Sequence, residues 1–219
     1  MRLFDRFKQG ELRLSRIEAF SDGVFAIVVT LLVLELKVPA LRDHGSVGEL
    51  TDRLAELLPK FLSWLISFVI VCKFWLNHHH LLEFARHANY AMVWLNSIFL
   101  LLQSFIPFPT ALLGEYPANP VALGLFGAVM AANTVAFIVL QSYIFRRLLK
   151  PELAGTADPH WLEKSFIGPA LYLLGSAVGW IHPYLSFALF MMTPLFFITP
   201  LPPRQSAGEA GACGDGAPG

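Results

Sequence analysis

The chain alternates between long apolar runs and short charged segments. The first run begins inside a charged and hydroxylated cluster, Arg16-Ile17-Glu18-Ala19-Phe20-Ser21-Asp22-Gly23. Thr30 is the only polar side chain in the apolar stretch that follows. The run from Phe20 to Val38 has about 19 residues, or about 28 Å as a helix, which is enough to cross the core of a bilayer. The pattern therefore predicts a membrane-spanning helix over about residues 16–38, ended by Pro39.

Five further apolar runs have the length of a helix. They lie at about residues 59–82, 89–108, 120–149, 164–181 and 183–199. Together with the first run they predict an all-α, polytopic membrane protein with six transmembrane helices per chain. Residues 1–200 are expected to form one six-helix domain. Residues 201–219, rich in proline, glycine and alanine, are expected to be a disordered tail.

Two local patterns refine this prediction. Pro107 and Pro109 are expected to break the third helix, which leaves residues 110–119 as a short outer segment. Within residues 40–58, leucines recur at helical spacing among charged residues, which predicts a short amphipathic helix at the membrane surface.

The composition and charge fit a membrane protein. Apolar residues make up 55% of the chain, charged residues only 15%, and the mean hydropathy is +0.57, values far from those of an ordinary soluble domain. The formal net charge is +0, so no overall field favours nucleic acid as a partner. The two cysteines, Cys72 and Cys213, do not suggest a disulfide framework.

The distribution of lysine and arginine predicts the orientation. There are five in residues 1–16, one in 82–88, four in 146–164 and one in the tail, against none in 113–119 and 182–183 and four in 37–60. This pattern predicts a multi-pass protein of the cell (inner) membrane with both termini in the cytoplasm, and only residues 37–60 oppose it.

The first helix carries an apolar stripe. Ile27, Leu31 and Leu34 fall at i, i+4 and i+7, so they share one face, and Thr30 lies beside them. In a symmetric oligomer, rings of such side chains can form a narrow constriction that closes by dewetting. The ordinary alternative, which spacing alone favours, is a stripe that packs on lipid or protein.

Polar side chains leave two other functions open. His78, His79 and His80 are adjacent, so a regular helix points them about 100° apart and they cannot all ligate one metal ion. With Glu83 nearby they allow a membrane metalloenzyme or metal transporter, but the geometry favours interfacial histidines without a metal or cofactor. Asp22, a carboxylate that is costly inside a membrane unless it faces protein or water, allows a proton-coupled carrier. The sequence contains no phosphate-binding loop or catalytic triad spacing, so we do not expect an enzyme.

Three elements together resemble the transmembrane protein 175 family, the lysosomal potassium channels and their prokaryotic relatives. They are Arg16-x-x-x-Phe20-Ser21-Asp22, Trp75-Leu76-Asn77-His78-His79, and Pro107-Phe108-Pro109-Thr110-Ala111-Leu112-Leu113-Gly114-Glu115-Tyr116. They cover the chain to about residue 120, beyond which only the pattern of spans is similar. The resemblance implies a potassium-selective cation channel with K⁺ as the permeant ion and no carbonyl-loop filter. For a chain with one six-helix repeat it implies a homotetramer in the lipid bilayer.

The same resemblance assigns roles to individual residues. It implies that the first helix lines the pore, with a bottleneck ring at Ile27, further apolar layers at Leu31 and Leu34, and a hydroxyl near the constriction at Thr30. It also implies that the motif anchors this helix by hydrogen bonds. The residues expected to take part are Arg16, Phe20, Ser21, Asp22, Trp75, His78 or His79, and Asn96.

Overall fold

The computed structural model describes residues 13–153 and 161–196, and these are almost entirely helical. The principal helices are α2 (Leu14–Leu32), α3 (Val47–Glu56), α4 (Leu58–Glu83), α5 (Tyr90–Phe105), α6 (Pro107–Glu115), α7 (Pro120–Tyr143), α8 (Trp161–Val178) and α9 (Pro183–Phe196). A 3-10 helix, Val33–Glu35, extends α2, a π-helical turn, Ile144–Leu148, extends α7, and Pro151–Leu153 forms a second 3-10 helix. The expected disordered tail lies outside the described residues.

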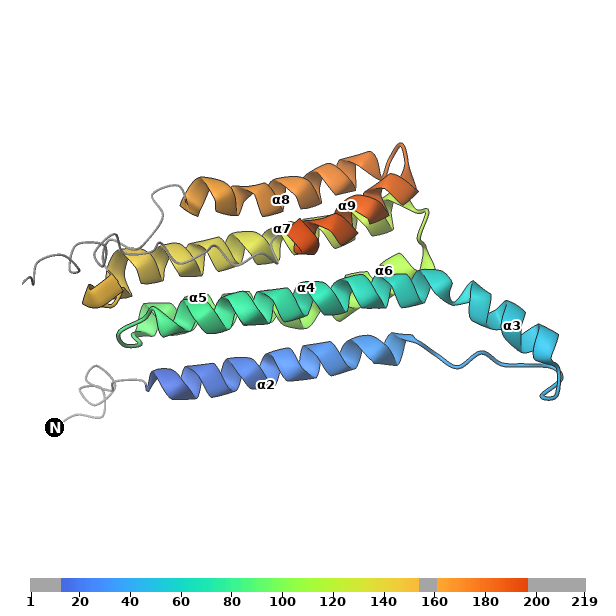
Figure 1. Ribbon diagram of the computed structural model, residues 1–219, viewed down its shortest axis with the longest axis horizontal. Coiled ribbons are helices and arrows are strands. Elements are labelled where there is room, and N and C mark those ends of the chain that lie inside the picture. The colour runs from blue at the N-terminus through green and yellow to red at the C-terminus, as the bar shows by residue number, and fades with distance from the viewer. Residues whose placement is uncertain (1–12, 154–160, 197–219) are drawn as a thin grey trace, which may run out of the picture.

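The long helices run side by side along one axis (Figure 1). Helix α2 lies at one edge of the bundle and packs on α4 and α5, while α8 lies at the opposite edge and packs on α7 and α9. Helix α3 differs from the rest, because it projects beyond the end of the bundle. Within the described residues the fold is therefore a helical bundle with one protruding helix.

Four helical stretches in the described part of the chain are long and apolar enough to cross a membrane. They are Leu14–Glu35, Leu58–Glu83, Tyr90–Glu115 and Pro120–Leu148. The shorter helices α8 and α9 lie beside them. The chain is thus an all-helical protein with several apolar spans. Its helices α4, α7, α8 and α9 start and end within a few residues of the expected runs, and residues 197–199 of the last expected run lie outside the described residues.

The first helix ends earlier than the sequence analysis predicted. Regular α-helix stops at Leu32, a 3-10 helix continues to Glu35, and Leu36 leaves helical geometry with φ −85° and ψ 83°. The prediction relied on Pro39, which disfavours helix at and just before its own position but does not require the helix to extend that far. The charged side chains of Glu35 and Lys37 bring the chain to water before that point, where backbone groups no longer depend on helical partners.

The third helix divides at the expected prolines, but the chain beyond them is not the expected outer segment. Helix α5 ends at Phe105 and α6 begins at Pro107, with the single intervening residue Ile106 in helical geometry. Pro107 and Pro109 occupy the first turn of α6, where backbone N–H groups have no helical acceptor, so proline is tolerated there. The expected outer segment 110–119 is therefore mostly helical, up to Glu115.

Close packing joins α7 to α8. A side-chain carbon placed on Gly127 would collide with the Ser176 hydroxyl and come within 2.6 Å of the Tyr172 carbonyl oxygen. The absence of a side chain at Gly127 is thus what allows the two backbones to approach, as is usual for small residues between membrane helices.

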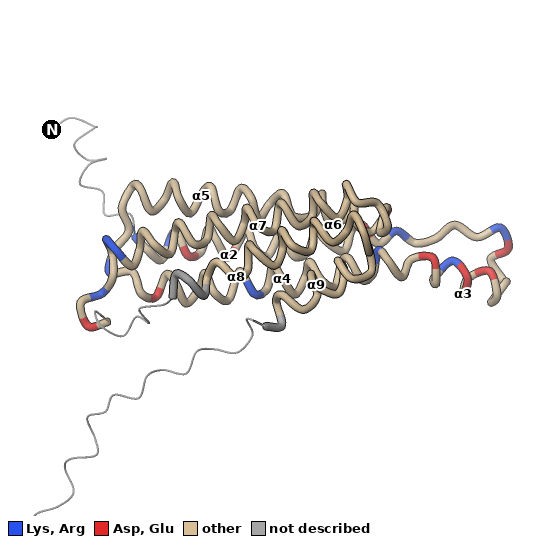
Figure 2. Tube along the Cα trace, turned by 90° about the horizontal axis from the view of Figure 1, so that it is seen from above, with Lys and Arg blue, Asp and Glu red and all other residues tan. Residues whose placement is uncertain are grey.

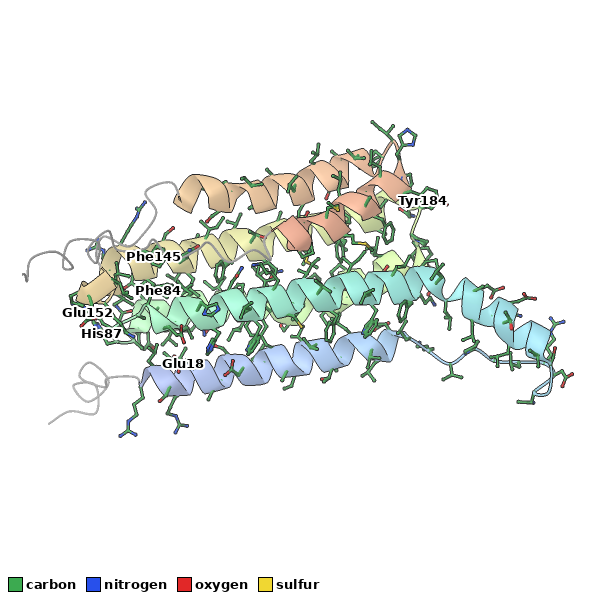
Figure 3. The ribbon with its side chains drawn as sticks, in the orientation of Figure 1. Glu18, Phe84, His87, Phe145, Glu152 and Tyr184 are labelled. Atoms are coloured by element: carbon green, nitrogen blue, oxygen red, sulfur yellow. The ribbon has the colours of Figure 1, made fainter. Side chains whose placement is uncertain are left out.

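The two ends of the bundle differ from its middle. Most charged residues lie toward the ends and on the loop around α3, with tan, uncharged stretches between them (Figure 2). Glu18, His87 and Glu152 lie at the end near the start of the chain, and Tyr184 lies at the other (Figure 3). At the first end, the backbone of the α4–α5 turn bonds the end of α7, Arg86 N to Leu148 O at 2.9 Å. We call the end with Glu18, His87 and Glu152 the inner end, and the end with Tyr184 the outer end.

Candidate functional site

Helix α2 has two unlike faces. One face is buried in the bundle and consists of Ile17, Ser21, Phe25, Val28 and Leu32, spaced as a helical stripe. The other face is exposed and carries Phe20, Ile27, Leu31 and, in the 3-10 turn, Leu34. The side chain of Ile27 is 59% exposed, although isoleucine is normally buried. Every residue expected to form the apolar constriction thus lies on the free face.

A chain of hydrogen bonds holds the buried face. Ser21, His78 and Asn96 come from α2, α4 and α5, and all three are almost completely buried. The Ser21 hydroxyl donates to the Ile17 carbonyl at 2.8 Å and accepts from Asn96 Nδ2 at 3.0 Å. Asn96 Oδ1 is 2.7 Å from His78 Nε2. Three helices are therefore tied together at one point by groups that water does not reach.

The direction of this chain follows from its chemistry. An amide oxygen can only accept, so Nε2 of His78 must carry the proton that it donates to Asn96. Asn96 then donates to Ser21, and Ser21 donates to a backbone carbonyl of α2. Each bond depends on the group next to it in the chain, which makes the three positions interdependent.

Aromatic rings enclose the buried histidine. The His78 ring stacks on Phe99 with centroids 5.6 Å apart and an interplanar angle of 17°, and it lies 5.6 Å from the Phe25 ring. Phe25 and Phe99 are themselves buried. Neither phenylalanine was predicted from the sequence to contribute to this site. The available signal was the position of Phe25, one helical turn after Ser21 on the same face.

A second contact joins α2 to α4 at the surface. The indole Nε1 of Trp75 donates to Asp22 Oδ1 at 2.9 Å. Asp22 is exposed and lies beside the buried face rather than within it. The bond gives the carboxylate a donor at the point where the apolar stretch of α2 begins, which lowers the cost of a charge there.

The structure brings together only part of the expected anchoring set. Ser21, Asp22, Trp75, His78 and Asn96 are joined by the bonds above. Arg16 and Phe20 instead lie on the exposed face of α2, as the helical spacing from Ile17 and Ser21 requires. His79 stacks on Trp75, with centroids 6.0 Å apart, so it supports the indole instead of bonding α2.

Thr30 is exposed beside Ile27, and its hydroxyl is partly engaged. It lies 3.0 Å from the Ala26 carbonyl and 2.9 Å from the Ile27 carbonyl, so its proton is donated back to its own helix. The hydroxyl oxygen keeps its two lone pairs as acceptors. The group can therefore accept a hydrogen bond or coordinate a cation, but it does not offer a free donor.

The histidine cluster does not form a metal centre in the described part of the chain. His79 Nε2 and His80 Nδ1 lie 3.6 and 3.5 Å from the two carboxylate oxygens of Glu83, on an exposed surface. His78 turns into the bundle instead. No group of three potential metal ligands occurs among the residues described, so this geometry gives no support to a metalloenzyme.

The fold and the site together define a class, a polytopic α-helical membrane protein whose first helix is anchored to its neighbours by buried polar contacts. A family model described as "Endosomal/lysosomal potassium channel TMEM175" matches residues 16–107, which include the whole hydrogen-bond chain. A relative from Chamaesiphon minutus, named a potassium channel, is 39% identical over 193 residues, covering 83% of this chain and 92% of the relative.

Two further similarities extend this result. The crystal structure of a lysosomal potassium-selective channel TMEM175 homologue from Chamaesiphon minutus superposes with a TM-score of 0.70 at 35% identity, covering 84% of this chain and 95% of that one. A chicken (Gallus gallus) relative, named an endosomal/lysosomal proton channel, is 35% identical over 83% of this chain but only 37% of its own length. The chain belongs to the TMEM175 channel family, and the resemblance found in its motifs is confirmed.

Proposed function

We propose that this protein is a potassium-selective cation channel in which four copies of the chain surround a pore lined by α2. The main observation in support of this proposal is that α2 has one face anchored in the bundle and one exposed apolar face. The chain belongs to a family whose bacterial relatives are named potassium channels, which supports K⁺ as the permeant ion. In a symmetric assembly the exposed face of α2 would line the axis, whereas exposed apolar residues of α5 such as Ile98 and Leu101 would face lipid.

We further propose six membrane spans, with α8 and α9 added to the four long ones. Both lie alongside α7 in the bundle, and both are rich in apolar residues. An even number of spans places both termini on one side, and lysine and arginine favour the cytoplasm of the cell (inner) membrane. Exposed Tyr90 and Trp94 near the inner end and Trp180 and Tyr184 near the outer end suit two interfacial belts.

In the proposed mechanism, Ile27 forms the narrowest ring. Leu31 and Leu34 add apolar rings toward the outer end, so the closed pore excludes water and ions by dewetting. A slight widening readmits water and lets partly dehydrated K⁺ pass. The lone pairs of Thr30, beside the ring, then replace part of the ion's hydration shell. Selectivity would come from this exchange, and flow would be passive.

The test is ion flux into liposomes that contain the purified protein, with K⁺, Na⁺ and Cs⁺ compared. Ile27→Asn replaces the apolar ring with amides, so we expect several-fold faster leak and weaker discrimination between K⁺ and Na⁺. Ile167→Asn is the matched control, because Ile167 is also exposed, at 42%, but lies on α8 at the opposite edge of the bundle. Equal flux in the two variants would place the bottleneck elsewhere.

A second candidate is a proton pathway that uses Asp22. The observation that favours it is an exposed carboxylate on α2 that accepts a hydrogen bond from Trp75, in a family whose animal relatives are named proton channels. Asp22→Asn keeps the acceptor for Trp75 and removes the titrating group. Loss of pH-driven dye response in liposomes, with K⁺ flux retained, would favour this candidate, and unchanged proton flux would remove it.

A further inference from the structure

An exposed apolar stripe runs from α3 into α4 without interruption. Its residues are Val47, Leu50, Leu54, Leu58, Phe61 and Leu65. The intervals of three and four residues put all six on one side of a helix. On the opposite side, α3 carries the charged residues Asp52 and Glu56. Helix α3 is therefore strongly amphipathic, yet none of its residues is buried within the described chain.

The junction between the two helices keeps the stripe continuous. Leu57 is the only residue between α3 and α4, and its backbone is close to helical, with φ −79° and ψ −8°. The Phe61 N–H donates to the Leu57 carbonyl at 2.9 Å, and the Leu57 N–H donates to the Leu54 carbonyl at 3.1 Å. The helical direction thus bends but does not stop, so side chains on both sides of the junction share one surface.

This surface crosses the outer boundary of the membrane. Glu35, Lys37, Lys60 and Glu115 gather around one small pocket at the outer end of the bundle. Lys60 and Glu115 form an ion pair there. Charged groups of this kind mark the edge of the hydrocarbon region. Phe61 and Leu65 lie on the membrane side of this level, whereas α3 projects away from it along the bundle axis (Figure 1).

Lipid can cover only part of such a stripe. Acyl chains would cover Phe61 and Leu65. They do not extend as far as Val47, Leu50 and Leu54, because α3 projects beyond the end of the bundle. A protein partner that itself extends from the membrane into the aqueous phase can cover both parts. We propose that a second copy of this chain, within the tetramer, packs on the stripe from Val47 to Leu65. This inference rests on the proposed tetramer, since a lone subunit offers no such partner.

The charges on α3 are compatible with packing between copies. Arg53 and Glu56 pair within the helix, at 3.0 Å, and the Glu49 carboxylate accepts from the backbone N–H groups of Arg42 and Asp43 at 2.9 and 3.1 Å. Most of the charge near the stripe is therefore satisfied inside one subunit. Adjacent copies can bring their apolar faces together without placing unpaired charges in the contact.

The test places single cysteines on the two sides of α3. In a background with Cys72→Ala and Cys213→Ser, Leu54→Cys probes the stripe and Asp52→Cys is the matched control on the water-facing side. Each variant is labelled with a small fluorophore and reconstituted into liposomes. Quenching is measured with aqueous iodide and, separately, with spin-labelled lipid.

We expect the label at position 54 to be protected from both quenchers by at least about threefold relative to position 52. Iodide quenching equal to that at position 52 would overturn the proposal by showing a bare stripe. Strong quenching by spin-labelled lipid would overturn it in favour of a helix lying on the membrane.

A second measurement does not depend on labelling. The double variant Leu50→Asn and Leu54→Asn should raise the dissociated fraction, measured by native mass spectrometry, at least about threefold over the water-facing control Asp52→Asn. Equal dissociation would count against packing between copies at α3. A channel that conducts K⁺ as a tetramer with a bare α3 stripe would refute this inference alone, whereas a monomer would refute the proposed assembly as well.

Discussion

The two faces of α2 are built from residues of similar hydropathy but are held in opposite ways. The buried face packs Phe25, Val28 and Leu32 into the bundle and adds the hydrogen-bond chain at Ser21. The exposed face presents Ile27 and its neighbours to whatever surrounds the subunit. The comparison shows that apolar character alone does not tell which side of a membrane helix is structural. A buried polar contact identifies the structural side, because such contacts require a fixed partner.

The largest effect is expected from Asn96→Leu. This change leaves the Nε2–H of His78 and the Oγ of Ser21 without their buried partner, and an unsatisfied buried group costs about 1–3 kcal/mol. We expect the free energy of unfolding, measured by denaturant titration in detergent, to fall by about 2–3 kcal/mol. Ser97→Ala is the control, since Ser97 bonds only its own helix at Val93. Equal losses in the two variants would contradict a structural chain.

The next effect tests whether the chain acts as a unit. Ser21→Ala alone removes the acceptor for Asn96 Nδ2, and we expect a loss of about 1–2 kcal/mol. Combined with Asn96→Leu it should cost less than the sum of the two, by about 1 kcal/mol, because both changes break the same bond. Strict additivity in the double-mutant cycle would mean that the two residues stabilise α2 independently.

A smaller effect is expected at the edge of the buried face. Trp75→Phe removes the Nε1–H that donates to Asp22 and keeps most of the ring. The pair is partly exposed, so water can replace the lost donor, and we expect a loss of about 1 kcal/mol or less. The melting temperature in detergent measures it. A loss as large as that of Asn96→Leu would mean that the surface contact is as important as the buried chain.

The smallest effect on stability should come from the bare face. Thr30→Val keeps the shape of the side chain and removes a hydroxyl that bonds only its own backbone, so unfolding should change by less than about 0.5 kcal/mol. Flux in liposomes should nevertheless show a lower preference for K⁺ over Na⁺. A marked loss of stability with unchanged selectivity would reverse the roles assigned to the two faces.

Much of the fold follows from the sequence because hydropathy is a strong signal in membrane proteins. Long apolar runs were sufficient to locate the helices, since a span must satisfy its backbone internally. The motif likewise indicated a contact between the first three long helices, and Ser21, His78 and Asn96 meet as a group. Two further points stay predictions: the tetramer, and the pore-lining roles of Ile27, Thr30, Leu31 and Leu34.

The errors came from residues whose effect depends on their neighbours. Pro107 and Pro109 lie where α5 ends, but because they fall in the first turn of α6 the chain after them stays helical. Pro39 did not set the end of α2, because Glu35 and Lys37 had already brought the chain to water. Arg16 and Phe20 share a motif with Ser21, but helical geometry turns them outward. A shared motif therefore does not imply a shared contact.

The position of the anchoring bonds along α2 has a mechanical consequence. Ser21 and Asp22 fix the start of the helix through directional bonds, whereas Val28 and Leu32, farther along, are held by packing. A rod clamped near one end rocks about that clamp, and the same small tilt moves its distant parts farther. Rocking of α2 about its anchored third would therefore displace Leu34 more than Ile27, so in the proposed pore the ring at Leu34 would widen before the ring at Ile27 does.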